Sequence, residues 1–204
     1  RDPDLVIEEN QENQEENLET ITFCVEETAG EILTWKGEAI DAAYHAVSSG
    51  NTRNAAEVSG QEGKDYLQSV ESRQDISSME YLNIIYMEKQ EMAQKLQGLL
   101  GDAATVDAEG LPDSLTIEAR DSAGYVTRVR CGSVVLNGEA VRDALGLSSS
   151  CFYFSRSDGK IRITCKGEGH GLGLSQYGAN ELAKEGKNYR EILKYYYQDV
   201  KISK

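Results

Sequence analysis

Short stretches in which hydrophobic and polar residues alternate recur along the chain, and this alternation is typical of strands with one buried face. Turns rich in Gly, Asp, Asn and Ser separate them, as expected at strand ends. The polar, glycine-punctuated stretch Asn51–Lys64 is predicted to be a surface loop. The predicted strands are Glu19–Glu27, Glu31–Trp35, Glu38–Val47, Tyr66–Val70, Ser114–Arg120, Gly124–Arg130, Cys151–Ser155 and Lys160–Cys165.

Two of the turns between these strands predict hairpins. Lys36-Gly37 joins the second and third predicted strands, and Asp158-Gly159 joins the last two. An Asp-Gly pair is preferred in two-residue type I′ turns because both residues then take a positive φ. With that turn, Phe152 pairs with Cys165 and Cys151 points to the opposite face. A disulfide between the two cysteines is therefore not expected.

Helices are predicted where capping residues coincide with apolar residues at helical spacing. Ser77 and Glu80 form a capping box, and so do Asn188 and Glu191. The predicted helices are Met79–Leu100, Gly138–Leu145 (capped by Asn137 and followed by Gly146), Ser175–Lys184 (ended by Gly186) and a last helix that runs from Asn188 to Tyr197. Mostly antiparallel strands with helices packed on them define an α+β fold.

The formal net charge of −14 is unevenly spread along the 204 residues. Residues 1–20 hold eight acids and one base with few apolar side chains, so residues 1–18 are predicted to be an acidic flexible linker or loop. Residues 19–204 are predicted to form the folded domain. Residues 160–204 hold nine bases and five acids, which favours an anionic partner, but no Lys/Arg cluster indicates nucleic-acid binding.

No apolar run approaches the roughly 20 residues that a membrane-spanning helix needs. The sequence shows no signal peptide and begins with Arg1 rather than Met, so we expect a segment upstream that this sequence does not include. Any attachment to a membrane is expected to lie in a segment outside this chain.

The four cysteines show neither a Cys-x-x-Cys pair nor a regular spacing. We interpret them as small buried residues in or beside strands. A metal held by Cys and His from distant segments is the open alternative, but we predict neither a metal site nor a cofactor. The cysteines are Cys24, Cys131, Cys151 and Cys165.

The stretch Gly167–Ala179, which reads G-E-G-H-G-L-G-L-S-Q-Y-G-A, is rich in glycine and chemically varied. Glycines at every second position leave one face of an extended backbone without side chains, so a polymer or another backbone can approach closely. The alternative is a tight structural turn whose glycines allow close packing. An acid, an imidazole, a hydroxyl and an amide lie beside this face, at Glu168, His170, Ser175 and Gln176.

Three familiar glycine-rich sites do not fit this stretch. A dinucleotide-binding G-x-G-x-x-G needs a glycine where Leu172 or Leu174 stands. A P-loop needs a terminal Gly-Lys-Ser or Gly-Lys-Thr, which is absent. A nucleophile elbow G-x-S-x-G that starts at Gly173 meets Tyr177 in place of its last glycine.

The two histidines of the chain, His45 and His170, each lie next to a turn rich in Ser or Gly. This shared context predicts that both face one groove, with Ser48 beside them. The alternative for each is a hydrogen-bonded structural histidine at a strand end.

The stretch Gly167–Ala179 resembles the hallmark G-[KR]-G-x-G-H-G-x-G-x-S-Q-x-G-A of the stage II sporulation protein D (SpoIID/LytB) family, with Cys165 in place of the first glycine. The similarity covers residues 20 to 204. Its other segments are Thr28–Gly37, Tyr44–Gly50, Tyr66–Val70, Asn180–Gly186 and Tyr189–Tyr197.

Members of this family are lytic transglycosylases that cut the glycan strands of peptidoglycan during engulfment in spore-forming bacteria. The resemblance implies an extracytoplasmic protein of the cell envelope and sporulation septum, with peptidoglycan glycan strands and sporulation-complex proteins as partners. The family's catalytic residue is a glutamate that acts as general acid/base and precedes an Ala/Gln-rich helix ending in Ala-Arg-Thr. That segment is not found here, so we expect the catalytic glutamate upstream of this chain.

The residues present are predicted to hydrogen-bond sugar hydroxyls and N-acetyl groups. A helix that starts at Ser175 leaves free backbone N–H groups for an acetamido or carboxylate group. Glu168 is interpreted as a solvated rim residue, and Glu26 and Glu27 have no special context. The predicted substrate-binding residues are His170, Ser175, Gln176, Gly169, Gly171, Gly173, His45 and Ser48.

Two functions therefore remain open for the chain. The first is the groove half of a transglycosylase whose acid lies elsewhere. The second is a non-catalytic wall-binding or assembly module on the same fold. A glutamate in front of an A-Q-A-V-x-A-R-T segment upstream would favour the first function.

Overall fold

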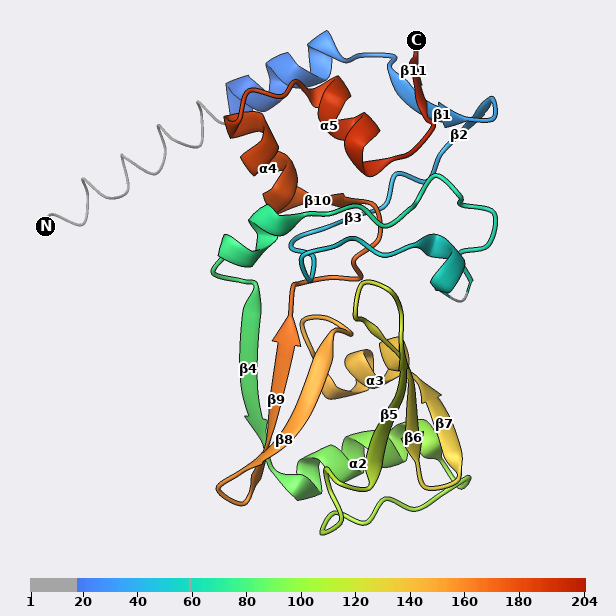
Figure 1. Cartoon of the computed structure of the whole chain (residues 1–204), viewed down its shortest axis with the longest axis vertical. Coiled ribbons are helices and arrows are strands. Elements are labelled where there is room, and N and C mark those ends of the chain that lie inside the picture. The colour runs from blue at the N-terminus through green and yellow to red at the C-terminus, as the bar shows by residue number, and fades with distance from the viewer. Residues whose placement is uncertain (1–17, 59) are drawn as a thin grey trace, which may run out of the picture. The chain divides into compact units, whose positions relative to one another are not determined.

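The computed structural model describes residues 18–58 and 60–204 (Figure 1). The chain divides into two compact units, one formed by residues 1–40 with Lys201–Lys204 and the other by Asp41–Val200. The predicted acidic linker of residues 1–18 lies outside the described residues except for Leu18. Helices combined with mostly antiparallel sheets confirm the α+β class.

The described part of the first unit contains a helix over residues 18–27 and a small antiparallel sheet. β1 (Ile32–Trp35) pairs with β2 (Glu38–Ala39) on one side and with β11 (Lys201–Ser203) on the other. This arrangement confirms the hairpin around Lys36-Gly37. The third predicted strand is shorter than expected, because β2 ends at Ala39 instead of continuing to Val47.

The strand predicted over Glu19–Glu27 is wrong, because this stretch is helical. Leu18, Ile21 and Val25 lie three and four residues apart, which is the spacing of one helical face. Thr22 and Thr28 donate their hydroxyls to backbone carbonyls four residues earlier, at 2.8 and 2.7 Å. The helical spacing and these local hydrogen bonds outweigh the strand propensity of the β-branched residues.

Two three-stranded antiparallel sheets and two helices of the second unit enclose its main hydrophobic core (Figure 1). The first sheet has the order β4-β9-β8 and the second the order β5-β6-β7. The elements are β4 (Leu82–Met87), α2 (Lys89–Leu100), β5 (Leu115–Arg120), β6 (Val126–Cys131), β7 (Val134–Asn137), α3 (Gly138–Leu145), β8 (Phe152–Ser157) and β9 (Lys160–Lys166). Their fully buried side chains include Met92, Leu96, Val129, Val141, Phe152, Ile161 and Ile163.

The hairpin β8–β9 forms as predicted. Asp158 and Gly159 have φ of 48° and 81°, the positive values of a type I′ turn. Phe152 pairs with Cys165 in the register, and the described cysteines are all free thiols. Cys151 is buried and unpaired, as expected from its position on the opposite face.

The helix predicted over Met79–Leu100 is wrong in its first half. Residues 82–87 form β4, which pairs along its whole length with β9, and α2 begins only at Lys89. The predicted capping box of Ser77 and Glu80 does not form, because Ser77 is the last residue of a 3₁₀ helix and the residue that precedes α2 is Glu88. The apolar run Leu82–Met87 fits a helical face and a strand equally well. Pairing with a strand far along the chain decides between them.

The caps of the remaining helices are confirmed. Asn137 accepts the backbone N–H of Glu139 at the start of α3, and Gly146 follows the helix in the left-handed conformation with φ of 69°. α4 (Gln176–Lys184) starts after Ser175, which accepts the N–H of Gly178. α5 (Tyr189–Tyr196) starts with the predicted capping box of Asn188 and Glu191.

Residues 41–75 are mostly irregular, and much of this segment is buried. β3 (Tyr44–His45) pairs in parallel with β10 (Leu174–Ser175), and η1 (Ala55–Glu57) and η2 (Arg73–Ser77) are short 3₁₀ helices. The prediction of an entirely surface-exposed loop over Asn51–Lys64 is wrong at Thr52 and Arg53, which are almost fully buried. No strand forms over Tyr66–Val70, because Val70 and Leu67 instead accept hydrogen bonds from single loop residues.

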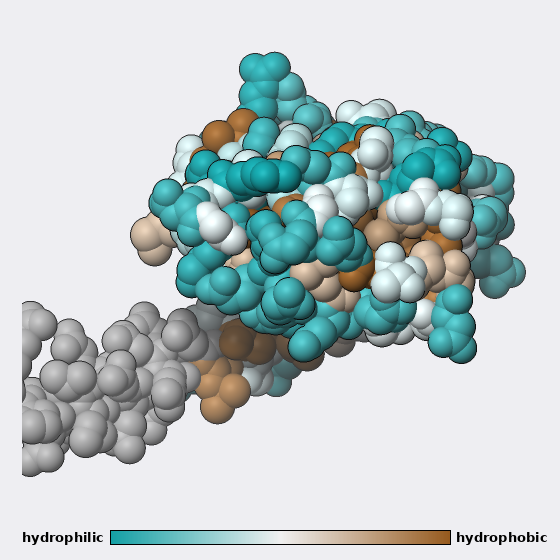
Figure 2. Space-filling view, turned by 90° about the horizontal axis from the view of Figure 1, so that it is seen from below, coloured by the Kyte–Doolittle hydropathy of each residue, from teal (hydrophilic) through white to brown (hydrophobic). Residues whose placement is uncertain are grey.

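The surface seen from below is mostly hydrophilic, with small hydrophobic patches between the polar side chains (Figure 2). In the part of the chain that the structure describes, no helix is both long and apolar enough to cross a membrane.

Candidate functional site

The glycine-rich segment lies in direct contact with residues 43–48, inside the second unit. Leu174 pairs with Tyr44 and Ser175 with His45 in the short β10–β3 sheet. Further back, Glu168 and Val47 exchange both backbone hydrogen bonds, at 3.1 and 2.7 Å. The two stretches that the sequence analysis singled out, around His45 and around His170, are therefore neighbours in space.

The four alternating glycines are enclosed by the chain itself. All have positive φ, between 69° and 102°. A Cβ at Gly169 would lie 2.8 Å from the Cβ of His45, and one at Gly173 would overlap the carbonyl oxygen of Ala43. Val47 and Tyr125 crowd Gly167 and Gly171 in the same way. Protein atoms occupy the side on which a Cβ would lie, so the absence of side chains at these glycines allows the two segments to touch.

The rings of His45 and His170 lie 5.8 Å apart between centroids. His45 is only 4% exposed, and its Nδ1 donates to the carbonyl of Leu172 at 3.1 Å. The Nδ1 of His170 accepts the backbone N–H of the same residue, also at 3.1 Å, so its proton is on Nε2. Leu172 thus fixes opposite tautomers in the two rings.

Both histidines favour the neutral form at neutral pH. Burial lowers the pKa of His45 from 6.5 to about 4, although its hydrogen bond to Leu172 opposes part of this shift. Burial also lowers the pKa of His170, and the charge of Arg142 adds to the effect. His45 Nε2 is buried without a hydrogen-bond partner among the described residues.

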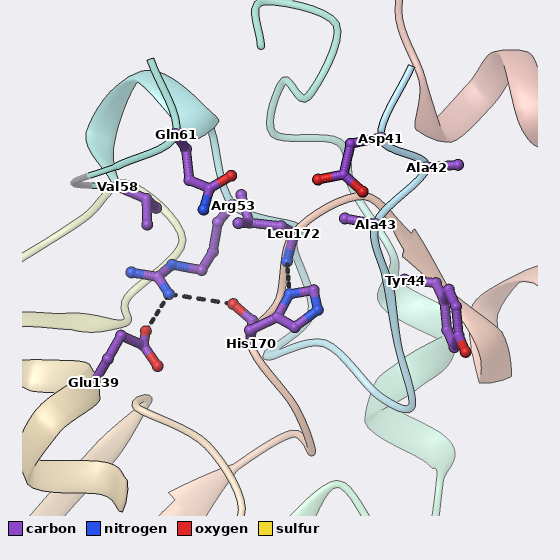
Figure 3. A pocket seen from close by; sticks show the side chains of 10 residues that line it. All are labelled: Asp41, Ala42, Ala43, Tyr44, Arg53, Val58, Gln61, Glu139, His170 and Leu172. Carbon is purple, nitrogen blue, oxygen red and sulfur yellow. Dashed lines mark hydrogen bonds and ion pairs between the residues drawn. The ribbon is translucent and has the colours of Figure 1, made fainter. Parts of the chain in front are cut away.

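A pocket of about 510 Å³ opens beside His170 (Figure 3). Arg53 and Glu139 lie on one side of the imidazole and Asp41 and Tyr44 on the other (Figure 3). Of the side chains predicted from the sequence to bind substrate, His170 is the one that lines this pocket. The full lining consists of Asp41, Ala42, Ala43, Tyr44, Arg53, Val58, Gln61, Glu139, His170 and Leu172.

Ser48 and Ser175 are fully buried, and both form hydrogen bonds inside the fold. Both are held by the carboxylate of Asp75, which accepts the backbone N–H of Ser48 and the hydroxyl of Ser175 at 2.8 Å each. Ser175 also caps α4, so its hydroxyl is fully engaged. Gln176, by contrast, is exposed at the first position of that helix. Its predicted contact with a ligand stays a prediction.

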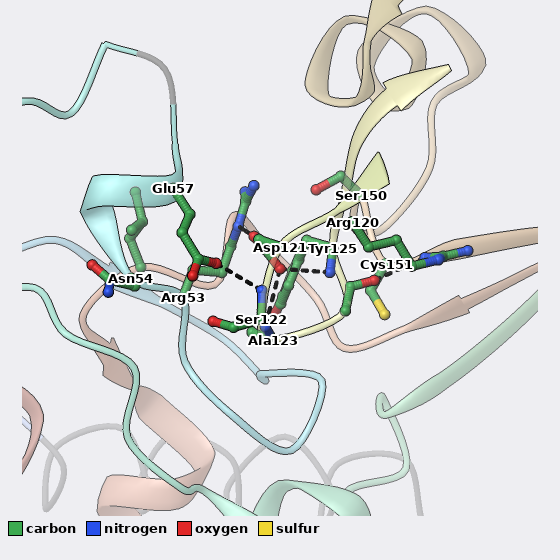
Figure 4. Close-up of polar contacts among 12 residues, drawn as sticks. Arg53, Asn54, Glu57, Arg120, Asp121, Ser122, Ala123, Tyr125, Ser150 and Cys151 are labelled. Atoms are coloured by element: carbon green, nitrogen blue, oxygen red, sulfur yellow. Dashed lines mark hydrogen bonds and ion pairs between the residues drawn. The ribbon is translucent and has the colours of Figure 1, made fainter. Parts of the chain in front are cut away.

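Arg53 is the buried cation of the site, with 2% of its side chain exposed. Its Nε donates to Asp121 at 2.6 Å, and its Nη1 donates to Glu139 and to the carbonyl of His170. The guanidinium also lies 4.7 Å from the ring centroid of Tyr125 (Figure 4). Paired with two carboxylates, this buried charge fixes the loop that carries His170.

Glu139 presents the carboxylate that sequence reasoning missed. Its Oε1 accepts from Arg53 and from the Ser150 hydroxyl, and its Oε2 lies 3.6 Å from Arg142. Glu139 sits in the first turn of α3. It follows Gly138, at which an added Cβ would overlap the carbonyl oxygen of Val126. The Asn-Gly-Glu helix start was visible in the sequence. Nothing local indicated that it faces Arg53.

The remaining carboxylates that the sequence analysis weighed lie elsewhere. Glu168 is exposed and does not line the pocket, and Glu26 and Glu27 are exposed in the first unit. Within the described residues, no group of three or more His, Cys, Asp or Glu side chains has the arrangement of a metal site. The side chains that line the pocket include two carboxylates, an amide, an imidazole and a phenol ring.

The structure defines an α+β protein with a pocket that the glycine-rich segment lines in part, through His170 and Leu172. No protein-family model matches the chain. Two curated proteins named stage II sporulation protein D are similar to it: that of Bacillus amyloliquefaciens is 39% identical over 188 residues, and that of Bacillus subtilis is 36% identical over 189 residues. The chain belongs to the stage II sporulation protein D family.

These matches cover 92% and 93% of this chain but 52% of each relative, so the chain spans about half the length of the curated relatives it matches. A shorter stretch of 38 residues is 55% identical to a protein of Bacillus subtilis named amidase enhancer; it covers 19% of this chain and 5% of that protein.

Proposed function

We propose that the pocket beside His170 binds the glycan strands of peptidoglycan, and that the chain is the groove half of a lytic-transglycosylase-type protein that remodels the wall during sporulation. Relatives named for sporulation and for enhancing an amidase support a sporulation role connected with the cell wall, in a spore-forming bacterium. The ligand, the pocket and an extracytoplasmic location at the sporulation septum are the proposed additions.

The observation that carries the proposal is the lining of the pocket. An amino sugar presents hydroxyls and an acetamido group around an apolar ring, and a site for it combines hydrogen-bonding side chains with a flat apolar surface. Asp41, Glu139 and Gln61 supply acceptors and an amide, while the ring of Tyr44 is 62% exposed beside them. The Nε2–H of His170 adds a neutral donor.

The proposed roles are binding and positioning. Glu139 Oε1 already accepts hydrogen bonds from Arg53 and Ser150, so we assign this carboxylate to orienting sugar hydroxyls. Cleavage of a glycosidic bond needs a general acid, and we propose that the family's glutamate supplies it from outside this chain. Glycan strands and proteins of a sporulation complex are the proposed partners.

Titration of the chain with purified, peptide-free glycan strands tests the proposal. Tyr44→Ala and His170→Ala are each expected to weaken binding by about three- to tenfold, the loss of one or two hydrogen bonds or an equivalent ring contact. Gln176 does not line the pocket, so a similar loss in Gln176→Ala would mean that the bound strand extends to the start of α4. The melting temperatures of the three variants should stay close to the parent value, because Tyr44 and Gln176 are exposed and His170 is half-buried. Isothermal titration calorimetry and thermal unfolding measure the two effects.

Glu88→Gln is the control, since Glu88 is exposed, lies outside the pocket and pairs with Lys160. Normal glycan binding by the Tyr44 and His170 variants, or a stability loss as large as that of Leu174→Ala, would assign the pocket to packing. Binding without cleavage in any longer form of the protein would favour the non-catalytic wall-binding module.

A further inference from the structure

We propose that the outer face of the β4-β9-β8 sheet is a docking surface for an acidic polypeptide segment. We call this surface the β4 face. It lies on the side of the sheet opposite the hydrophobic core. It consists of Leu82, Ile84, Tyr86, Tyr153, Thr164, Arg162 and Lys166.

The first observation is an unprotected sheet edge. β4 pairs with β9 on one side, and no described strand pairs with its other side (Figure 1). Soluble proteins usually guard such an edge with a charge, a proline or a bulge. None occurs from Leu82 to Met87. On the outer face, the apolar side chains of Leu82, Ile84 and Tyr86 are between 37% and 58% exposed. Apolar side chains on this face are typical of a strand that another element covers.

The second observation is the placement of cations on this face. The register puts Lys166 beside Leu82 and Arg162 beside Tyr86, with Thr164 between Ile84 and Tyr153. Arg120 reaches over the same tyrosine from β5, 4.1 Å from the ring centroid, and the ammonium of Lys166 lies 5.6 Å from it. Exposed apolar side chains therefore lie next to three positive charges.

These cations lack acidic partners. Among the described residues, Arg120, Arg162 and Lys166 form no ion pair, and the Nε of Arg162 is buried without a hydrogen-bond partner. Just outside the face, Lys160 pairs with Glu88 and Arg156 with Asp113. In a chain with 35 acids and 21 bases, a face that carries cations alone is complementary to an acidic partner.

The chemistry of the face favours a polypeptide over two other occupants. Leu82 and Ile84 offer nothing to the hydroxyls or phosphates of an anionic wall polymer, but match the apolar side of a peptide, and the β4 backbone can pair with an added strand. A second copy paired through β4 would bring two sets of Arg162 and Lys166 onto one continuous face, where like charges repel. The acids of such a segment pair with the cations of the β4 face, and its apolar side chains pack against the apolar side chains of β4.

Fluorescence anisotropy with a labelled random copolymer of glutamate and tyrosine tests the proposal. The chain is expected to bind this probe, less tightly as salt is raised. Ile84→Glu and Lys166→Glu should each weaken binding by about tenfold, because each puts a negative charge against the acidic probe. Lys187→Glu makes the same charge change at an exposed site outside the face and should leave binding unchanged. Circular dichroism confirms that each variant is folded.

Three results would overturn the proposal. Equal binding of the probe by Ile84→Glu, Lys166→Glu and the parent chain would place its site elsewhere. Tighter binding of poly(glycerol phosphate), lost in the same variants, would assign the face to an anionic wall polymer. A dimer in sedimentation velocity that Ile84→Glu abolishes would assign it to a second copy. Since none of these uses glycan strands, failure here leaves the proposed glycan site untouched.

Discussion

Arg53 shows how a single buried residue organises the candidate site. Its guanidinium joins Asp121, Glu139 and the carbonyl of His170, which come from three separate parts of the chain. Removing one partner of such a buried ion pair leaves an uncompensated charge and is strongly destabilising. These ionic contacts thus hold together the separate parts of the chain that line the pocket.

His45 predicts a specific loss of stability in mild acid. Its pKa is about 4 in the folded protein and near 6.5 when unfolded, so below about pH 6.5 the unfolded chain takes up a proton that the folded chain does not. The contribution of neutral His45 to the free energy of unfolding is complete above pH 6.5 and is lost as the pH falls toward 4. Between about pH 7.5 and about pH 5, the free energy of unfolding should fall by about 2 kcal/mol.

The variant His45→Asn provides the control for this pH dependence. Its amide retains a donor for the Leu172 carbonyl but has no group that titrates in this range. Urea unfolding at the two pH values should show a clearly smaller difference for His45→Asn than for the parent chain. An unchanged difference would mean that other groups cause the pH dependence.

At the scale of elements, the glycine-rich segment allows close packing and carries His170, the proposed binding residue. Gly173→Ala should destabilise the protein by about 3 kcal/mol or more, because the added Cβ overlaps the Ala43 carbonyl and the residue has φ of 69°. Urea-induced unfolding, followed by circular dichroism, measures this loss.

Gly186→Ala is the matched variant, since Gly186 has φ of 91° but open space around its Cβ position. It should show the conformational cost alone, about 1 kcal/mol. Similar losses in the two variants would show that the contact between residues 43–48 and the glycine-rich segment contributes little to stability.

At the scale of the whole molecule, the chain spans about half the length of its curated relatives. We expect that the 204 residues alone do not release anhydro-muropeptides from purified peptidoglycan, because the glutamate segment expected from the family resemblance is absent from this sequence. A longer form of this protein that includes the expected upstream glutamate segment, assayed in parallel, is expected to release them.

Mass spectrometry of the soluble digestion products checks this expectation. Anhydro-muropeptides from the chain, with preparations of an inactive unrelated protein as the blank, would contradict it and would require a catalytic carboxylate among the residues present. Glu139 would then be the first candidate, since it lines the pocket, and Glu168 the second.

The sequence by itself determined the features that depend on a few neighbouring residues. Asp158-Gly159 specified a hairpin because the turn needs two positive φ values. Asn137 with Gly146, and Asn188 with Glu191, specified helix ends because a cap is satisfied within one turn. The α+β class and the family resemblance followed from such local patterns together with the glycine-rich stretch.

Only the tertiary structure decided which residues form the pocket. Glu139 meets Arg53 across 86 positions, and His45 meets Leu172 across 127, so no local pattern encodes either contact. The same holds for β4, whose apolar residues fit a helix until β9 supplies hydrogen bonds along one edge. Alternating glycines indicated a close approach, but whether a ligand or the chain itself makes that approach depended on where residues 43–48 fold.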